Sequence, residues 1–181
     1  MKKIKEFGNK KIMIREMSAK DLKNVKGFQD YINSLIEEDA QILFDKKFSI
    51  KQERKALEDM IRKIKAHKRV FLYAEADGLI VGFVHVEAGR GRKSHIGSYG
   101  IAIREDYRGV GIGKYLTTEV IRLAKKKLKP EPKIISLTVF PDNKPAIKLY
   151  EKFGFKKVAT IPDQLEYKGK LIDEIVMLKY L

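Results

Sequence analysis

The sequence contains no cysteine in its 181 residues. Without a thiol the chain has no disulfide framework, no thiolate zinc site and no cysteine nucleophile. The absence also fits a reducing compartment. We expect no bound metal.

Long apolar runs are missing as well. No stretch approaches the roughly 20 apolar residues that a membrane-spanning helix needs. The opening Met1–Lys5 is followed at once by Glu6 and further polar residues, so the apolar region of a signal peptide is absent. We therefore expect a soluble, cytoplasmic protein with no membrane partner.

Internal repeats, low-complexity segments and Ser/Gly-rich linkers are also lacking. A chain of 181 residues fits one core, because single domains commonly run to about 100–200 residues. The simplest organisation is one domain that spans residues 1–181. Nothing in the sequence decides between a monomer and a homodimer.

The chain does have an excess of positive charge, with a formal net charge of +15. Such a surface attracts polyanions, which include nucleic acids and small cofactors with several phosphates. A lysine-rich, solvated surface is the alternative that needs no partner. Because the lysines are spread along the whole chain rather than clustered, a nucleic-acid partner is disfavoured.

Hydrophobic spacing and turn residues predict the secondary structure. Ser18 with Asp21 and Ser49 with Gln52 resemble capping boxes, each at the start of a helix. The expected strands are 11–17, 69–76, 79–87, 96–104, 133–140, 155–161 and 171–180, and the expected helices are 18–38, one that starts at 49, 112–128 and 143–153. Hairpin-linked strands joined by helical crossovers predict an α+β fold. Its sheet has about seven strands, mixed but mostly antiparallel, with helices on both faces.

A glycine loop lies between an expected strand and an expected helix, at Arg108–Gly113. The free N–H groups of a helix N-terminus bind anions, and glycines let a pyrophosphate approach the backbone. Arg108 adds a permanent charge. The spacing fits neither a Walker loop nor the dinucleotide fingerprint, because Tyr115 follows Gly113-Lys114 and the third glycine of the fingerprint is missing. A tight turn without a ligand remains the alternative.

A second segment about thirty residues later runs Asn143-x-x-Ala146-x-x-Leu149-Tyr150-x-x-Phe153-Gly154-Phe155. Asn143 suits a helix N-cap. Tyr150 by itself is typical of an aromatic residue packed on a sheet with its hydroxyl at the rim.

Together, Arg108-x-x-Gly111-x-Gly113 and the segment at 143–155 resemble the GNAT superfamily of acetyl-CoA-dependent N-acetyltransferases. The resemblance covers roughly residues 69–181. The tail at 169–177 is similar to the branch of amino-acid and small-amine N-acyltransferases. The resemblance implies a sheet that is splayed at the cofactor, where the pantetheine arm of acetyl-CoA inserts like an extra strand.

The resemblance also implies roles for individual residues. Tyr150 stands at the place of the family's general acid, and acetyl-CoA is the co-substrate. The residues implied to contact it are Ile101, Ala102, Ile103, Arg108, Gly109, Val110, Gly111, Ile112, Gly113, Lys114, Asn143, Ala146 and Tyr150.

Direct attack of an amine on the thioester requires a base for the proton of the amine. The family's acidic residue is absent near Ser98 and Tyr99. Glu87 is our first candidate and His85 the second, because period-2 alternation places both on one face of their strand. A solvent-facing polar role is the alternative for each of them.

The sequence leaves the acceptor open. A small-molecule primary amine, either an amino acid or a polyamine-like compound, is the first expectation. The alternatives are acetylation of protein or peptide N-termini or lysines and, in another class, a basic nucleic-acid-binding module. The acidic run Glu37-Glu38-Asp39 either attracts a cationic amine or is a solvated helix end.

Overall fold

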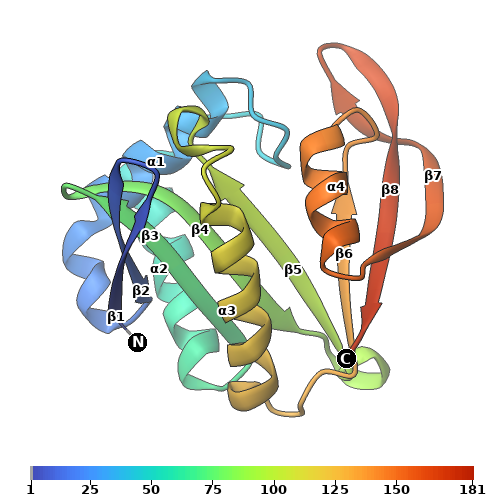
Figure 1. The fold of residues 1–181 in the computed structure, drawn as a ribbon, viewed down its shortest axis with the longest axis horizontal. Helices are drawn as coiled ribbons and strands as arrows, with labels where there is room; N and C mark the ends of the chain where they lie inside the picture. The colour runs from blue at the N-terminus through green and yellow to red at the C-terminus, as the bar shows by residue number, and fades with distance from the viewer. Residues whose placement is uncertain (1) are drawn as a thin grey trace.

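The structure is a computed structural model that describes residues 2–181. Within that range, eight strands form one sheet in the order β1-β2-β3-β4-β5-β6-β8-β7 (Figure 1). All neighbouring strands are antiparallel except β5 and β6, which are parallel. The strands are β1 Lys2–Phe7, β2 Lys10–Glu16, β3 Arg69–Ala76, β4 Leu79–Ala88, β5 Ile96–Ile103, β6 Ile134–Val139, β7 Lys156–Tyr167 and β8 Lys170–Tyr180.

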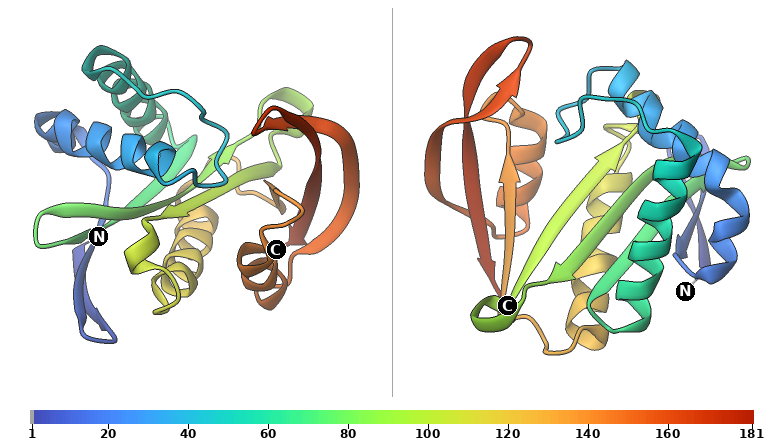
Figure 2. Two further views of the ribbon diagram at one scale, coloured as in Figure 1. Left: turned by 90° about the horizontal axis from the view of Figure 1, so that it is seen from above. Right: turned by 180° about the vertical axis from the view of Figure 1, so that it is seen from behind.

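Within the described residues, four α-helices cover the sheet from both sides, as the sequence predicts (Figure 2). They are α1 Val25–Glu37, α2 Ile50–Lys65, α3 Ile112–Lys127 and α4 Lys144–Lys152. On one face α1 and α2 pack against β3 and β4 around Leu35, Leu57 and Tyr73. On the other face α3 and α4 enclose a second core around Leu116, Val120 and Tyr150. The expected α+β class is confirmed, and no described helix has the length and apolarity that crossing a membrane requires.

The first expected helix is divided. Residues Ala19–Asn24 form a 3₁₀ turn, and α1 begins only at Val25. The capping pair is present, since the Asp21 carboxylate accepts a hydrogen bond of 2.7 Å from the Ser18 N–H. Asn24 then caps α1 by accepting from the Gly27 N–H, and this second cap starts a new helix.

The sheet has one strand more than we expected. No element is predicted from the sequence at Lys2–Phe7, which forms β1 and pairs with β2 through a turn at Gly8. All but one of its residues are exposed, so it lacks an apolar alternation. The seventh strand is also longer than predicted: β7 continues past Pro162 to Tyr167 by means of register shifts.

The sheet opens between β5 and β6. These strands pair only over Ile96–Ser98 and Ile134–Ser136, although β5 continues to Ile103 and β6 to Val139. Figure 1 shows the two strands diverging towards the end of the molecule at which α3 begins. The splay is therefore narrow at Ser98 and wide at Ile103.

Candidate functional site

The glycine loop lies at the wide end of the splay. Gly109 and Gly111 adopt φ values of +77° and +102°, a region that side chains with a β-carbon strongly disfavour. Gly111 is the N-cap of α3 and offers no side-chain acceptor, so the N–H groups of the first turn remain open to a ligand. Those N–H groups and the helix dipole make an anion site.

The other residues of the loop have separate tasks. Ile112 is buried and anchors the helix start in the core, whereas Val110 is exposed. At Gly113 a β-carbon would lie 3.4 Å from Ile103 and 3.5 Å from Leu149, which is ordinary contact. Lys114 is exposed in the first turn and leaves its charge available beside the loop.

The Arg108 side chain is already engaged. Its guanidinium pairs with Glu38 just after α1, and its Nε donates to the Ile103 carbonyl at 2.7 Å. We expected Arg108 to add free positive charge to the loop, but Glu38 compensates that charge here. Arg108 therefore ties the loop to α1 and β5.

The unexpected strand β1 supports the loop from the side. Phe7 packs edge-on against Tyr115 of α3, with ring centroids 5.9 Å apart, and lies next to Gly111. Lys5 sits over the Tyr115 ring at 4.6 Å, and Lys10 of β2 sits over Tyr107 at 4.4 Å. The β1–β2 hairpin therefore brings two cations near the anion site. The Gly8-Asn9 pair is a hairpin-turn signal that identifies it in the sequence.

Alternate residues of β5 turn their backbone groups into the splay. Arg104 N–H donates to Val81 on the β4 side, whereas the His95 carbonyl accepts from the β6 side. By the alternation of antiparallel pairing, Ile101 and Ile103 share the direction of His95. Their N–H and C=O groups thus face the gap, as expected for a strand-like ligand, although the Ile103 carbonyl is already occupied by Arg108.

Ala102, which the resemblance also places at the cofactor, has the opposite orientation. Its backbone faces β4, and its carbonyl accepts a 2.8 Å hydrogen bond from the Tyr31 hydroxyl. Its side chain packs on the α1–α2 core rather than towards α3. Direct contact with a ligand in the splay is therefore left to its two neighbours.

Tyr150 lies at the narrow end of the splay. Its ring packs against Tyr99, the first residue of β5 beyond the paired stretch, with centroids 5.8 Å apart and an interplanar angle of 84°. Burial raises the pKa of Tyr150 to about 12. The phenol is therefore protonated at neutral pH and has a proton to donate to a hydrogen-bond acceptor.

Tyr99 holds this arrangement in place. Its buried hydroxyl and the Thr117 hydroxyl are 2.8 Å apart, and Thr117 in turn donates to the Gly113 carbonyl at 2.8 Å. This relay joins the narrow end of the splay to the first turn of α3. The tyrosine ring next to Tyr150 is thus structural, and burial raises its pKa.

The helix that carries Tyr150 starts as expected. Asn143 is the N-cap of α4, and its side-chain oxygen accepts from the Ala146 N–H at 3.2 Å. Gly154 ends the helix with φ +80°. Ala146 packs against the α3–α4 core. Among residues 2–181 the Asn143 amide nitrogen makes no hydrogen bond, so it can donate to a ligand.

The two base candidates lie on the opposite face of the sheet. Glu87 is opposite Ser98 in the β4–β5 pair and His85 is opposite Gly100, so both flank the narrow end of the splay. Both point to the α1–α2 side, as the alternation predicts. The Glu87 carboxylate is held at 2.8 Å by Lys63 and at 2.6 Å by Arg69.

His85 is a neutral imidazole in a tight aromatic slot. It lies beside Phe71 and Phe83, with ring centroids 6.2 and 5.9 Å away. Burial, with Arg69 and Lys63 nearby, lowers its pKa to about 3. Its Nδ1 is enclosed without a hydrogen-bond partner. A β-carbon at Gly100 would lie 2.6 Å from the imidazole, so that glycine makes room for the ring.

The three acidic residues at the end of α1, Glu37 to Asp39, all form ion pairs. Glu37 pairs with Lys47, Glu38 with Arg108 and Asp39 with Lys168. Glu37 and Asp39 remain exposed to solvent, as a solvated helix end would be, and all three carboxylates have cationic partners within the chain. The acidic run joins α1 to the glycine loop and to the β7–β8 hairpin.

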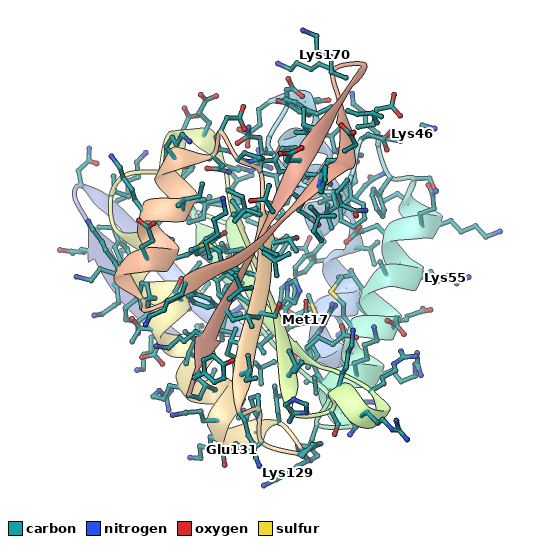
Figure 3. All side chains as sticks on the ribbon, turned by 90° about the vertical axis from the view of Figure 1, so that its right-hand side faces the viewer. Met17, Lys46, Lys55, Lys129, Glu131 and Lys170 are labelled. Carbon is teal, nitrogen blue, oxygen red and sulfur yellow. The ribbon has the colours of Figure 1, made fainter. Side chains whose placement is uncertain are left out.

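The loop between α1 and α2 also spans the wide end of the splay. Gln41 donates to Asp142 at 2.6 Å, and Tyr167 donates to the Asp39 carbonyl at 3.2 Å. Figure 3 shows Lys46 of this loop and Lys170 of the hairpin at the same end of the molecule. The wide end is therefore bridged on the α1–α2 face.

Comparisons with known proteins agree with this geometry. The sequence profile of the acetyltransferase (GNAT) family matches residues 32–155. The chain is 33% identical over 109 residues to an L-amino acid N-acetyltransferase of Escherichia coli K12, which covers 60% of this chain and 66% of that protein. It is 33% identical over 112 residues to an N-alpha-acetyltransferase of Sulfurisphaera tokodaii, which covers 56% of this chain and 65% of that protein.

A crystal structure of a GNAT-family acetyltransferase from Streptococcus pneumoniae has the same fold. Its TM-score is 0.81 at 26% sequence identity, with 94% of this chain and 99% of that chain covered. The matches to the two curated relatives span 66% and 65% of their lengths, just under two thirds.

Proposed function

The chain belongs to the acetyltransferase (GNAT) family, and from this premise we propose that it transfers an acetyl group from acetyl-CoA to a primary amine of a small molecule. The observation that carries the proposal is the splay, with an anion site at its wide end and Tyr150 at its narrow end. A pyrophosphate on the glycine loop would start the pantetheine arm along the unpaired backbone of Ile101 and Ile103. The thioester would then lie towards Ser98 and Tyr150.

Each step of the transfer has a candidate group in this arrangement. The neutral amine attacks the thioester carbon from the α1–α2 face, forming the N–C bond. An N–H of β5 that faces the splay, at Ile101, is placed to stabilise the oxyanion. As the C–S bond breaks, the Tyr150 hydroxyl donates a hydrogen bond to the departing thiolate, which leaves with the electron pair of that bond. The proton of the amine leaves on the opposite face, towards Glu87 by way of water.

His85 has a different part in this scheme. A group whose pKa is about 3 is too weak a base to remove a proton from an amine at neutral pH. The His85 imidazole packs between aromatic rings beside Gly100, so we expect it to line the acceptor side as an uncharged side chain. Glu87 stays our first candidate for the base because its carboxylate is on the same face, opposite Ser98.

Binding of acetyl-CoA is the first test. At a concentration 100-fold above Kd, acetyl-CoA should raise the free energy of unfolding by about 2.7 kcal/mol, which corresponds to a Tm increase of about 5–10 °C. A thermal melt with and without acetyl-CoA measures this. A thiol-release assay then compares amino acids, polyamines and peptides with free N-termini. An unchanged Tm together with no thiol release from any acceptor would reject the function.

Peptide N-termini are the second candidate acceptor, because one relative of equal identity is named an N-alpha-acetyltransferase. The same assay decides between them. A peptide with a higher kcat/KM than every free amino acid and polyamine would favour the second candidate.

The glycine loop gives a sharper test of the cofactor site. Gly111→Val should weaken acetyl-CoA binding by about 10–100-fold, because a β-branched residue at φ +102° introduces roughly 1–3 kcal/mol of strain and turns the first-turn N–H groups away. Isothermal titration measures the change.

Gly78→Val is the matched control for this substitution. Gly78 has φ +83° in the β3–β4 turn, and a β-carbon added there would have nothing within 4 Å. Both variants should lose stability, and only Gly111→Val should lose affinity. Equal affinities would remove the loop from the cofactor site.

A further inference from the structure

A basic pocket adjoins the acceptor side of the splay. Its volume is about 360 Å³, and it lies between the end of α2, the end of β4 and the loop that leads to β5. Its charged lining residues are Arg62, Lys63, Lys68, Glu87 and Arg90. Four of these five side chains are cationic, and two of the four, Arg62 and Lys63, also pair with Asp59 of α2. The loop that contributes Arg90 is the basic, glycine-containing segment 89–93, which the cofactor site leaves unused.

The one carboxylate that lines the pocket already pairs with two cations. Glu87 accepts from Lys63 and also from Arg69, which lies behind it on β3. Within residues 2–181, neither Lys68 nor Arg90 makes an ion pair, and Lys68 donates only to the Lys129 carbonyl, at 2.7 Å. Lys68 and Arg90 therefore carry positive charge that no ion pair among the described residues compensates, whereas Arg62 and Lys63 are paired with Asp59 and Glu87.

The positive charge of the pocket lies close to the expected place of the reaction. Glu87 is opposite Ser98, the last β5 residue that pairs with β6, so the pocket begins at the narrow end of the splay. Lys129 lies at the end of the molecule away from Lys46 and Lys170 (Figure 3). The pocket and the glycine loop are thus at opposite ends of β5. When the amine of an acceptor lies at the narrow end of the splay, the rest of the acceptor lies next to the pocket and away from acetyl-CoA.

We propose that the acceptor carries an anionic group, a carboxylate or a phosphonate-like group, which binds between Lys68 and Arg90 while its amine faces the splay. The proposal rests on the proposed acetyl transfer and narrows its substrate class to zwitterionic amines. Polyamines are disfavoured, because the pocket repels a second cation.

The test compares three acceptors that share one side chain: an α-amino acid, its amide and its aminophosphonic acid. Thiol release gives kcat and KM for wild type, Arg90→Gln and Lys68→Gln. An amide also lowers the pKa of the neighbouring amine, so each acceptor is compared between variants and not with the other acceptors. Lys55→Gln is the control, because Lys55 is exposed on α2 and lies outside the pocket (Figure 3).

Each pocket variant should raise KM for the anionic acceptors by about tenfold, the usual effect of losing one charge-assisted contact. KM for the amide should stay within about twofold, and Lys55→Gln should change neither value. The anionic group whose acceptor shows the larger rise in KM in Arg90→Gln is the group that the pocket recognises. Arg90 lies in an exposed loop and Lys68 lies just before β3, so both substitutions should leave the fold intact. Melting curves check that each variant is folded.

Two results would overturn the proposal: KM values for acid and amide that rise together, or a wild-type enzyme that acetylates neutral or polycationic amines and no anionic one. Failure of the proposed function has a different signature, which is the absence of acetyl-CoA binding and of thiol release from every acceptor.

Discussion

Replacing Tyr150 with Phe is expected to lower kcat by about 10²–10⁴-fold and to leave the Kd for acetyl-CoA within about twofold. The ring packs against Tyr99 and Phe155, and those contacts survive the change. Only the hydroxyl is lost. Because its pKa is about 12, that hydroxyl is a donor across the working pH range, and its loss leaves the departing thiolate without a partner.

Single-turnover kinetics and titration with acetyl-CoA separate the two quantities. Tyr180→Phe is the control, since Tyr180 is 73% exposed at the end of β8. A kcat for Tyr150→Phe that equals that of wild type would assign Tyr150 to packing alone, which is the alternative that the sequence leaves open.

The second large effect is expected on the opposite face. Glu87→Gln should lower kcat/KM by about 10²-fold at neutral pH, because the amide preserves the shape of the side chain but accepts no proton. Lys63 and Arg69 hold the carboxylate in place. The rate of the variant should partly recover as pH rises, because solvent base and neutral amine become more abundant.

The pH profile of kcat/KM with one small amine acceptor measures this difference. Glu37→Gln is the matched control, because Glu37 is a carboxylate that pairs with Lys47 outside the splay. Profiles of wild type and Glu87→Gln that superimpose would exclude Glu87 as the base and leave proton removal to water.

Features that depend only on residues close together in the sequence were predictable. Strand and helix types, the α4 cap at Asn143 and the place of the glycine loop follow from residue types at short spacing. The positive φ values at Gly109 and Gly111 give that spacing its physical reason. The shared face of His85 and Glu87 follows from the alternation of a strand.

Contacts between distant segments were not predictable. The Glu38–Arg108 pair joins residues 70 positions apart, so the sequence does not indicate that the arginine of the loop is already neutralised. Packing of Phe7 beside Gly111 is equally non-local. We missed β1, although Gly8-Asn9 marks its turn, because an exposed edge strand rich in lysine has no apolar period. Such lysines also keep an edge strand from pairing with other chains.

The splay lets the two partners approach the sheet from opposite sides. Tyr150 belongs to the α3–α4 core, whereas Glu87 and His85 face α1 and α2. If the chain carries out the proposed transfer, this layout does not require one substrate to leave before the other enters, and among residues 2–181 we identify no nucleophile placed between them. We therefore expect the proposed transfer to proceed through a ternary complex, in which the sheet separates the two substrates and the acetyl group passes between them through the gap between β5 and β6.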